Sequence, residues 1–162
     1  MPGVFTFPNP VNEKAARTVA AGVVVLSLLA LLPGVRWLTL VLAAGFWLRV
    51  AAGPRFSPLG QLATRVIAPR LGEPRLVAGP PKRFAQLIGA TVTSLAAICL
   101  LAGAVGASQL LLAAIVVAAG LESGLGLCLG CVIFGQLMRT GLIREEVCLE
   151  CATVGLRYRQ NG

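Results

Sequence analysis

The longest uncharged stretch of this sequence is the strongest constraint on its fold. From Phe84 to Leu121, 38 consecutive residues carry no charge. A helix needs about 20 apolar residues to cross a hydrocarbon core of about 30 Å. The stretch therefore holds most of two membrane crossings, and the small residues of "GAVGAS" at 103–108 mark the turn between them.

Two further apolar runs precede this stretch, because no charge lies between Arg17 and Arg36 or between Arg36 and Arg49. The chain is 57% hydrophobic and 12% charged, whereas soluble domains are about a quarter charged. We therefore expect an all-α fold: an integral membrane four-helix bundle that forms a single polytopic domain over residues 1–162. The expected helices are 15–33, 36–52, 82–103 and 108–138, followed by a cytoplasmic tail at 139–162.

Basic residues gather on one side of the expected bundle. They precede the first helix, fill the loop after the second and follow the last, whereas the turn at 103–108 has none: Lys14, Arg17, Arg55, Arg65, Arg70, Arg75, Lys82, Arg83, Arg139 and Arg144. The positive-inside rule then places both termini and the central loop in the cytoplasm. Membrane topology and attraction to anionic lipid together explain the net charge of +8. The expected partner is therefore the bilayer and not nucleic acid.

The central loop has a pattern of its own. In "PLGQLATRVIAPRL" apolar residues recur at helical spacing from Leu59 to Ile67, which predicts a short amphipathic helix in the cytoplasmic interface that ends by Pro69. Basic and amide side chains flank this loop: Arg49, Arg55, Lys82, Arg83 and Gln86. They can bind an anion together, or contact the phosphates of lipid headgroups.

At the N-terminus, Asn9 followed by Pro10 predicts a helix N-cap with proline at the first helical position. Glu13 would then lie near the positive end of that helix.

Missing residue types exclude several kinds of site. The chain contains no His and no Asp, which excludes a Ser-His-Asp triad, a Cys-His dyad and any histidine metal site. No segment reads as a strand followed by a Gly-rich phosphate loop. Chemistry in this chain must therefore be carried by Cys and Glu.

Four of the five cysteines form two Cys-Leu-x-Cys pairs, Cys128/Cys131 and Cys148/Cys151. Three interpretations remain open: a dithiol or sulfur relay, a four-thiolate zinc site, and inert cysteines. Cytoplasmic disulfides are usually transient and catalytic, which favours the relay. Glycine is the residue type that typically ends a helix, and a hairpin at Gly141 would bring the two pairs together.

In the relay, Cys128 is the attacking thiolate, Cys131 the resolving thiol and the second pair an additional dithiol. A chain break at Gly126 would put Cys128 at a helix start, where a thiolate is stabilised. In the zinc interpretation all four thiols, Cys128, Cys131, Cys148 and Cys151, are ligands. Cys99 is expected to be a small buried hydrophobe.

Glu122 lies about 20 Å from the outer end of the last helix, within the hydrocarbon. A carboxyl group at that depth is expected to face protein or water and to act as proton donor or acceptor. Glycines recur around it at Gly120, Gly124, Gly126 and Gly130, a spacing that favours close helix packing. The 31 residues from Ser108 to Met138 exceed a membrane span, so the helix must project into the cytoplasm or bend near "SGLGLC".

The segments "FPNPVNEKAAR", "RFSPLG", "GPPKRFAQLIG" and "GLESGLGLCLGCVIFGQL" resemble the bacterial membrane family called domain of unknown function 4395. The resemblance implies a four-helix protein of the bacterial inner membrane. Genes of this family tend to lie near those of thioredoxin-like and rhodanese-like proteins, which implies such a protein as partner. Cys128 and Cys131 fall on the family's most recognisable motif, and Glu122 matches the acidic residue of a short polar stretch before it. Cys148 and Cys151 belong to a tail that many members lack or vary.

The sequence therefore predicts a membrane relay of disulfides or sulfane sulfur that exchanges with a cytoplasmic thiol protein. It holds no certain cofactor, and zinc is the alternative, in a non-enzymatic clamped module. A third hypothesis is a small transporter of a sulfur-containing anion that enters near Arg49, Lys82 and Arg83. Four helices make a thin pathway, so the transporter requires a homodimer.

Overall fold

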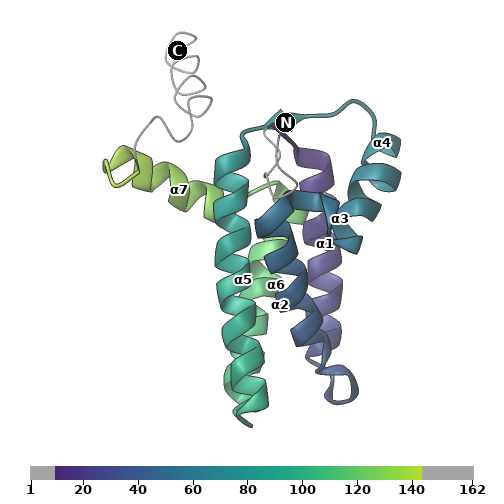
Figure 1. Cartoon of the computed structure of the whole chain (residues 1–162), viewed down its shortest axis with the longest axis vertical. Helices are drawn as coiled ribbons and strands as arrows, with labels where there is room; N and C mark the ends of the chain where they lie inside the picture. Colours follow the sequence, from purple (N-terminus) through teal and green to yellow (C-terminus); the bar gives the residue numbers. More distant parts are fainter. Residues whose placement is uncertain (1–9, 144–162) are drawn as a thin grey trace.

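The computed structural model describes residues 10–143, and these residues are almost entirely helical (Figure 1). Four long helices lie side by side, and the chain reverses direction between them. They are α1 (Glu13–Ala30), α2 (Leu38–Ala52), α5 (Gly79–Leu101) and α6 (Val105–Leu125). The expected all-α class is confirmed.

Shorter elements connect the long helices. The α1–α2 connection contains a 3₁₀ turn, η1 (Pro33–Val35). The central loop winds through η2 (Gly53–Arg55), α3 (Pro58–Leu62), a π-helical turn η3 (Ala63–Ile67) and α4 (Ala68–Arg70). The helical path therefore covers the predicted segment and continues to Arg70, past Pro69, which is tolerated because it lies in the first turn of α4.

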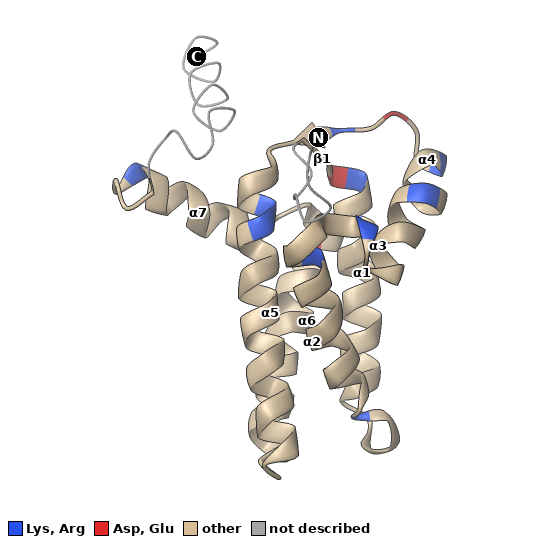
Figure 2. Cartoon of the chain, viewed as in Figure 1, with Lys and Arg blue, Asp and Glu red and all other residues tan. Residues whose placement is uncertain are grey.

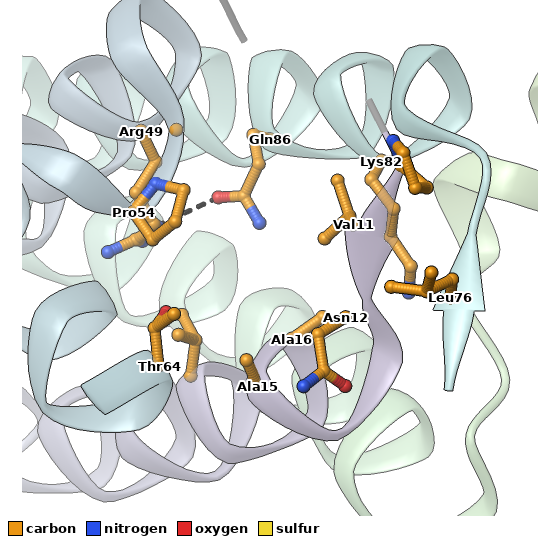
Figure 3. A pocket seen from close by; sticks show the side chains of 13 residues that line it. Val11, Asn12, Ala15, Ala16, Arg49, Pro54, Thr64, Leu76, Lys82 and Gln86 are labelled. Atoms are coloured by element: carbon orange, nitrogen blue, oxygen red, sulfur yellow. Dashed lines mark hydrogen bonds between the residues drawn. The ribbon is translucent and has the colours of Figure 1, made fainter. Parts of the chain in front are cut away.

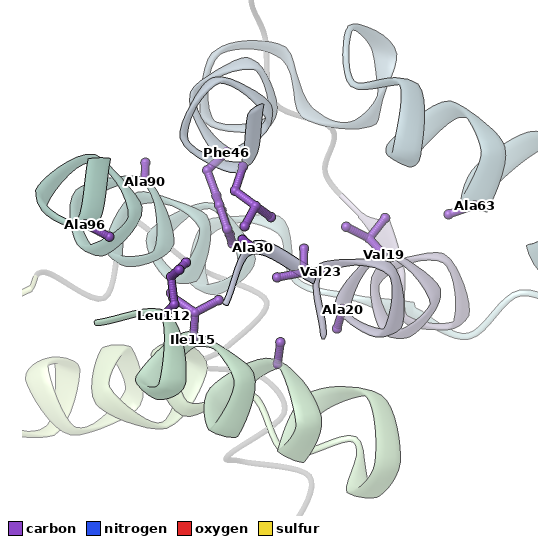
Figure 4. Packing of buried hydrophobic residues seen from close by; sticks show 12 residues of the cluster. Val19, Ala20, Val23, Ala30, Phe46, Ala63, Ala90, Ala96, Leu112 and Ile115 are labelled. Atoms are coloured by element: carbon purple, nitrogen blue, oxygen red, sulfur yellow. The ribbon is translucent and has the colours of Figure 1, made fainter. Parts of the chain in front are cut away.

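The core of the bundle is made of small side chains (Figure 4). α1 packs on α6, α2 on α5, and α5 on α6. The buried residues shared by these contacts are Val19, Ala20, Val23, Ala30, Leu42, Phe46, Ala90, Ala96, Leu112, Ile115 and Ala119. Alanine at so many contacts lets the backbones approach closely, and Gly89 leaves the space that the Phe46 ring fills.

The predicted last helix, 108–138, is two helices. α6 ends at Leu125, and α7 (Leu129–Arg139) leaves the bundle sideways (Figure 1). Gly126 has φ +70°, and its amide donates to the carbonyl of Glu122 at 3.0 Å, which is the αL type of helix end. The length of this segment predicted either a straight projection into the cytoplasm or a bend near "SGLGLC". The chain bends, at this glycine-rich segment.

The N-cap prediction was one turn too early. Asn12, not Asn9, caps α1, and its Oδ1 accepts the amide of Lys14 at 3.0 Å. The reason is a short antiparallel strand pair, β1 (Val11–Asn12) with β2 (Leu76–Val77), where no strand was predicted. This pairing keeps residues 11 and 12 extended, so the helix begins at Glu13, whose Oε2 lies 3.0 Å from Nε of Arg75.

Two helices, α5 and α6, are long and apolar enough to cross a membrane. α1 has 18 residues but carries Glu13, Lys14 and Arg17 in its first turns, and α2 has only 15 residues. Apolar helices of membrane-spanning length were expected, and within the described residues α5 and α6 have this length and composition.

Candidate functional site

Charged residues collect at one end of the bundle (Figure 2). This end holds the start of α1, the central loop, the start of α5 and the junction between α6 and α7. The described charge at the other end is Arg36, in the α1–α2 connection. The described ends of the chain and the central loop therefore share one side of the bundle.

An ion pair joins α5 to α6 at this end. Nζ of Lys82 lies 2.6 Å from Oε1 of Glu122, and the two side chains are 9% and 15% exposed. Lys82 is in the first turn of α5 and Glu122 in the last turn of α6, which are the unfavourable helix ends for a cation and an anion respectively. The attraction between the two charges offsets the unfavourable interaction of each charge with the dipole of its own helix. Glu122 faces protein, as expected, although its lysine partner was not predicted.

The chain turn after α6 places the first thiol pair beside this ion pair. Cys128 is the N-cap of α7, and its Sγ accepts the backbone amide of Cys131 at 3.3 Å. The hydrogen bond from the Cys131 thiol lowers the pKa of Cys128, and the positive charge of Lys82 lowers it further, against burial and the charge of Glu122. The same bond raises the pKa of Cys131. The arrangement therefore concentrates thiolate character on Cys128.

The two cysteines also differ in exposure to solvent. Cys128 is 7% exposed, whereas Cys131 is half-buried, one helical turn further along α7. The more acidic thiol is therefore the less accessible one.

Packing on α5 fixes the position of α7. A Cβ atom on Gly130 would lie 2.5 Å from Cα of Ala85, so only glycine allows this approach. One turn later, the rings of Phe84 and Phe134 meet with their centroids 5.7 Å apart. Close packing through glycine was predicted for four positions, but Gly120 and Gly124 have no neighbour within 4 Å of such a Cβ.

An arginine closes the end of α6. The guanidinium of Arg17 donates to the carbonyl of Ser123 at 3.1 and 3.3 Å and to that of Gly124 at 3.0 Å. These carbonyls have no partner within the helix, so Arg17 satisfies them and ties α1 to the turn before Cys128. Sequence reasoning assigned Arg17 only to topology, since nothing local indicates a partner 106 residues away.

A cavity of about 270 Å³ lies between α1, α2, α5 and the central loop (Figure 3). We call it the basic cavity. It is lined by Pro10, Val11, Asn12, Ala15, Ala16, Val19, Arg49, Gly53, Pro54, Thr64, Leu76, Lys82 and Gln86. Arg49, Gln86 and Lys82 lie along one side, and Asn12 of β1 lies opposite with Ala15 and Ala16 of α1.

The basic cavity includes three of the five residues predicted to hold an anion. Arg49, Lys82 and Gln86 line it, whereas Arg55 and Arg83 do not. Nε of Arg83 instead donates to the carbonyl of Val50 at 3.2 Å.

The remaining cysteines do not join the pair within residues 10–143. Cys99 lies near the other end of α5, 17 residues or about 25 Å along the helix from Lys82. It is half-buried. Cys148 and Cys151 lie outside the described residues, so the second dithiol and the four-thiolate zinc site are not described. Between Pro10 and Ile143, no group of three or more potential Cys, Asp or Glu metal ligands comes together.

A family model matches residues 11–139, which is most of the chain. The chain belongs to the family described as Domain of unknown function (DUF4395). This confirms the resemblance found in the sequence. No curated protein and no solved structure matches the chain.

The DUF4395 match includes every element of the site, from β1 to the end of α7. Lys82, Glu122, Cys128, Cys131 and Arg49 all lie within it. Cys148 and Cys151 lie beyond it, so the matched region holds one of the two thiol pairs.

Proposed function

We propose that this DUF4395 protein is a four-helix protein of the bacterial inner membrane whose Cys128–Cys131 pair exchanges disulfides with a cytoplasmic thiol protein. The observation that carries the proposal is the Cys128 thiol at the start of α7, which accepts the Cys131 amide beside the buried Lys82–Glu122 pair. A thiol with a depressed pKa at a helix start next to a second thiol is the arrangement of dithiol exchange proteins.

The distribution of charge and apolar surface supports the membrane part of the proposal. Large apolar side chains along α5 and α6 are exposed, among them Ile98, Leu101, Leu110 and Val117. Such surfaces are rarely left to water and suit contact with lipid tails. The basic end of the bundle then faces the cytoplasm by the positive-inside rule, and the thiol pair lies at that end.

The difference in exposure between the two cysteines supports a separate role for each. In the oxidised pair, a thiolate of the partner attacks Sγ of the more exposed Cys131, the Cys128–Cys131 bond breaks, and Cys128 leaves as a thiolate. A thiol of low pKa is the better leaving group. The second thiol of the partner then attacks the partner's own sulfur in the mixed disulfide, and Cys131 leaves and takes up a proton.

Two electrons and one proton have then passed from the partner, which began as a thiolate and a thiol, to the pair, which ends as the Cys128 thiolate and the Cys131 thiol. In the reverse direction, Cys128 is the thiolate that attacks the mixed disulfide held on Cys131. Cys131, expected from the sequence to be only the resolving thiol, is thus the sulfur that meets the partner. Glu122 lies near enough for its charge to act on both thiols, and it supplies or accepts the accompanying proton.

A trapping experiment tests these roles. The probe is a thioredoxin whose resolving cysteine is replaced by serine, added to the oxidised protein in neutral detergent. The protein carries Cys99→Ser, Cys148→Ser and Cys151→Ser, so that only the pair can react. We expect a mixed disulfide that peptide mass spectrometry locates on Cys131. A bond on Cys128 would reverse the roles, and failure to trap any bond would reject the exchange with a thioredoxin-like protein.

Intact mass of the unmodified protein, before and after reduction, distinguishes the two forms of relay. Loss of two hydrogens in the oxidised form indicates disulfide exchange, and gain of a sulfur atom indicates sulfane sulfur from a rhodanese-like partner. Metal content is measured on the same sample. One zinc per chain that is lost in a Cys148→Ser variant would overturn the relay in favour of a zinc-clamped module.

A further inference from the structure

Arg49 is a buried cation that no carboxylate among residues 10–143 neutralises directly. Its side chain is in the last turn of α2 and only 5% of the residue is exposed. Nε donates to Oε1 of Gln86 at 2.9 Å, and Nη1 donates to Oγ of Ser57 at 3.1 Å. The guanidinium also lies over the ring of Phe46, 4.5 Å from its centroid. All of these partners are neutral.

The remaining nitrogen of this guanidinium, Nη2, is buried and has no hydrogen-bond partner within the described chain. Leaving a buried charged donor unsatisfied costs free energy, and a buried charge is normally paired. The described ion pairs are Glu13–Arg75 and Lys82–Glu122, so neither involves Arg49. Arg49 also lines the basic cavity.

We infer that the basic cavity binds a small organic anion, with a singly charged oxyanion on Arg49 and an apolar body against α1. The inference does not use the thiol chemistry proposed above, although Lys82 belongs to both sites.

The charge of the ligand follows from the groups around it. Arg49 and Lys82 each contribute one positive charge, and Glu122 contributes one negative charge at 2.6 Å from Lys82. With Cys128 as a neutral thiol, one positive charge is left among these three groups, which a carboxylate or a phosphodiester matches and a doubly charged phosphate monoester exceeds. A planar guanidinium binds such oxyanions well, because two of its N–H groups can reach two oxygens.

The apolar body follows from the cavity walls. Val11, Ala15, Ala16, Val19 and Leu76 line it with hydrocarbon, and its volume is about 270 Å³. An inorganic ion would leave these walls without contacts. A short aliphatic chain next to the oxyanion fills them and adds apolar burial to the charge pairing.

Two sources can supply this chemistry, a free carboxylate or the phosphodiester headgroup of a lipid. The experiment therefore has two arms on purified full-length protein in a neutral sugar detergent. One arm adds sodium hexanoate and the other adds dihexanoyl phosphatidylglycerol. Sodium chloride of equal ionic strength is the reference. The thermal unfolding midpoint is followed by tryptophan fluorescence.

The variants are Arg49→Gln, which removes the charge, and Ala16→Leu, which fills the cavity but keeps Arg49. Arg83→Gln is the matched control, because this arginine is near the same end of the bundle, outside the cavity. At about ten times its dissociation constant, we expect the ligand to raise the midpoint of the wild type and of Arg83→Gln by about 3 °C. We expect no rise in Arg49→Gln or Ala16→Leu.

A rise with hexanoate alone identifies a free carboxylate, a rise with the lipid alone identifies a headgroup site, and a rise with both supports the shared chemistry. No rise with either, or an equal rise with sodium chloride, overturns the inference. An undiminished rise in Arg49→Gln overturns it as well. If Arg49→Gln does not fold, Ala16→Leu decides by the same criterion.

Discussion

Lys82 links two parts of the molecule through a single side chain. It pairs with Glu122 at 2.6 Å, and it lines the basic cavity. Its charge also stabilises the thiolate of Cys128, whereas that of Glu122 opposes it. Removing either charge should therefore move the reactivity of Cys128, and in opposite directions.

This expectation is testable by alkylation across pH. Because the pKa of Cys128 is lowered, its thiolate persists to lower pH than an ordinary thiolate and is lost as the pH falls through that pKa. Lys82→Gln removes the favourable charge, so the pKa rises and alkylation at pH 7 slows several-fold. Glu122→Gln removes the opposing charge, so the pKa falls and alkylation at pH 7 speeds up. Iodoacetamide, a small alkylating reagent, reports the rate.

The reporter protein carries Cys131→Ser, which keeps a hydroxyl donor for Cys128, and serine at the other three cysteines. Thermal unfolding is recorded in parallel, because removal of one partner of a buried ion pair costs about 3–5 kcal/mol. Equal pH midpoints in both variants would show that the charges do not act on the thiol.

At the scale of single residues, the sequence pointed to residues that the structure brings together at one end of the bundle, but not to how they pair. Glu122 was singled out from its depth in an apolar helix, and the acidity of Cys128 from a helix start that required a break at Gly126. Lys82 was assigned to a basic cluster. Its pairing with Glu122 joins positions 40 residues apart, and the register of the α5–α6 hairpin sets it. No local pattern encodes that register.

At the scale of elements, the end of α6 decides where the thiols lie. Gly126 adopts φ +70°, a conformation that side chains rarely adopt, and a Cβ there would also lie 3.3 Å from Oε1 of Glu13. If the helix continued, Cys128 would be an interior residue without the free amide of Cys131. The sequence indicated a bend near this glycine but could not choose it over a straight projection, because the apolar pattern continues through both helices.

Gly126→Ala should destabilise the protein by about 1–2 kcal/mol, since alanine is strained in the left-handed conformation. Gly120→Ala is the control in the same helix. It has ordinary helical geometry and no neighbour within 4 Å of its Cβ, so it should stabilise by up to about 1 kcal/mol. Equilibrium unfolding in detergent measures both. Equal stabilities would mean that the left-handed turn is not required.

The contact between α7 and α5 is a second feature of this element. A Cβ on Gly130 would meet the backbone of Ala85 at 2.5 Å, so Gly130→Ala should push α7 away from α5 at a cost of about 1–3 kcal/mol. We expect faster amide hydrogen exchange throughout Leu129–Arg139. Gly135→Ala, in the same helix with no neighbour within 4 Å, should slow this exchange or leave it unchanged. Similar protection in both variants would show that α7 does not depend on this contact.

At the scale of the whole molecule, the two halves of the bundle differ in length. α5, with 23 residues, spans about 34 Å, and α6, with 21, spans about 31 Å, so both match a hydrocarbon core of about 30 Å. α1 and α2 reach only about 27 and 22 Å. The sequence predicted four crossings, the first two over 15–33 and 36–52, because its uncharged runs extend past the helix ends. The helices are shorter because Asn12 and Pro33 limit α1, and Gly53 limits α2.

Single cysteines test each half of the bundle separately, in a protein whose five native cysteines are replaced by serine. Gly34→Cys reports the α1–α2 connection and Gly106→Cys the start of α6, and both sites are exposed with open space around them. Glu73→Cys reports the central loop. In spheroplasts, a membrane-impermeant maleimide should label positions 34 and 106 at once, and position 73 only after permeabilisation. Labelling at 106 but not at 34 would restrict the crossing to α5 and α6, with α1 and α2 held on the cytoplasmic side. Labelling of position 73 from outside would place the thiol pair on the outer face and contradict exchange with a cytoplasmic partner, because the central loop and Cys128 share one end of the bundle.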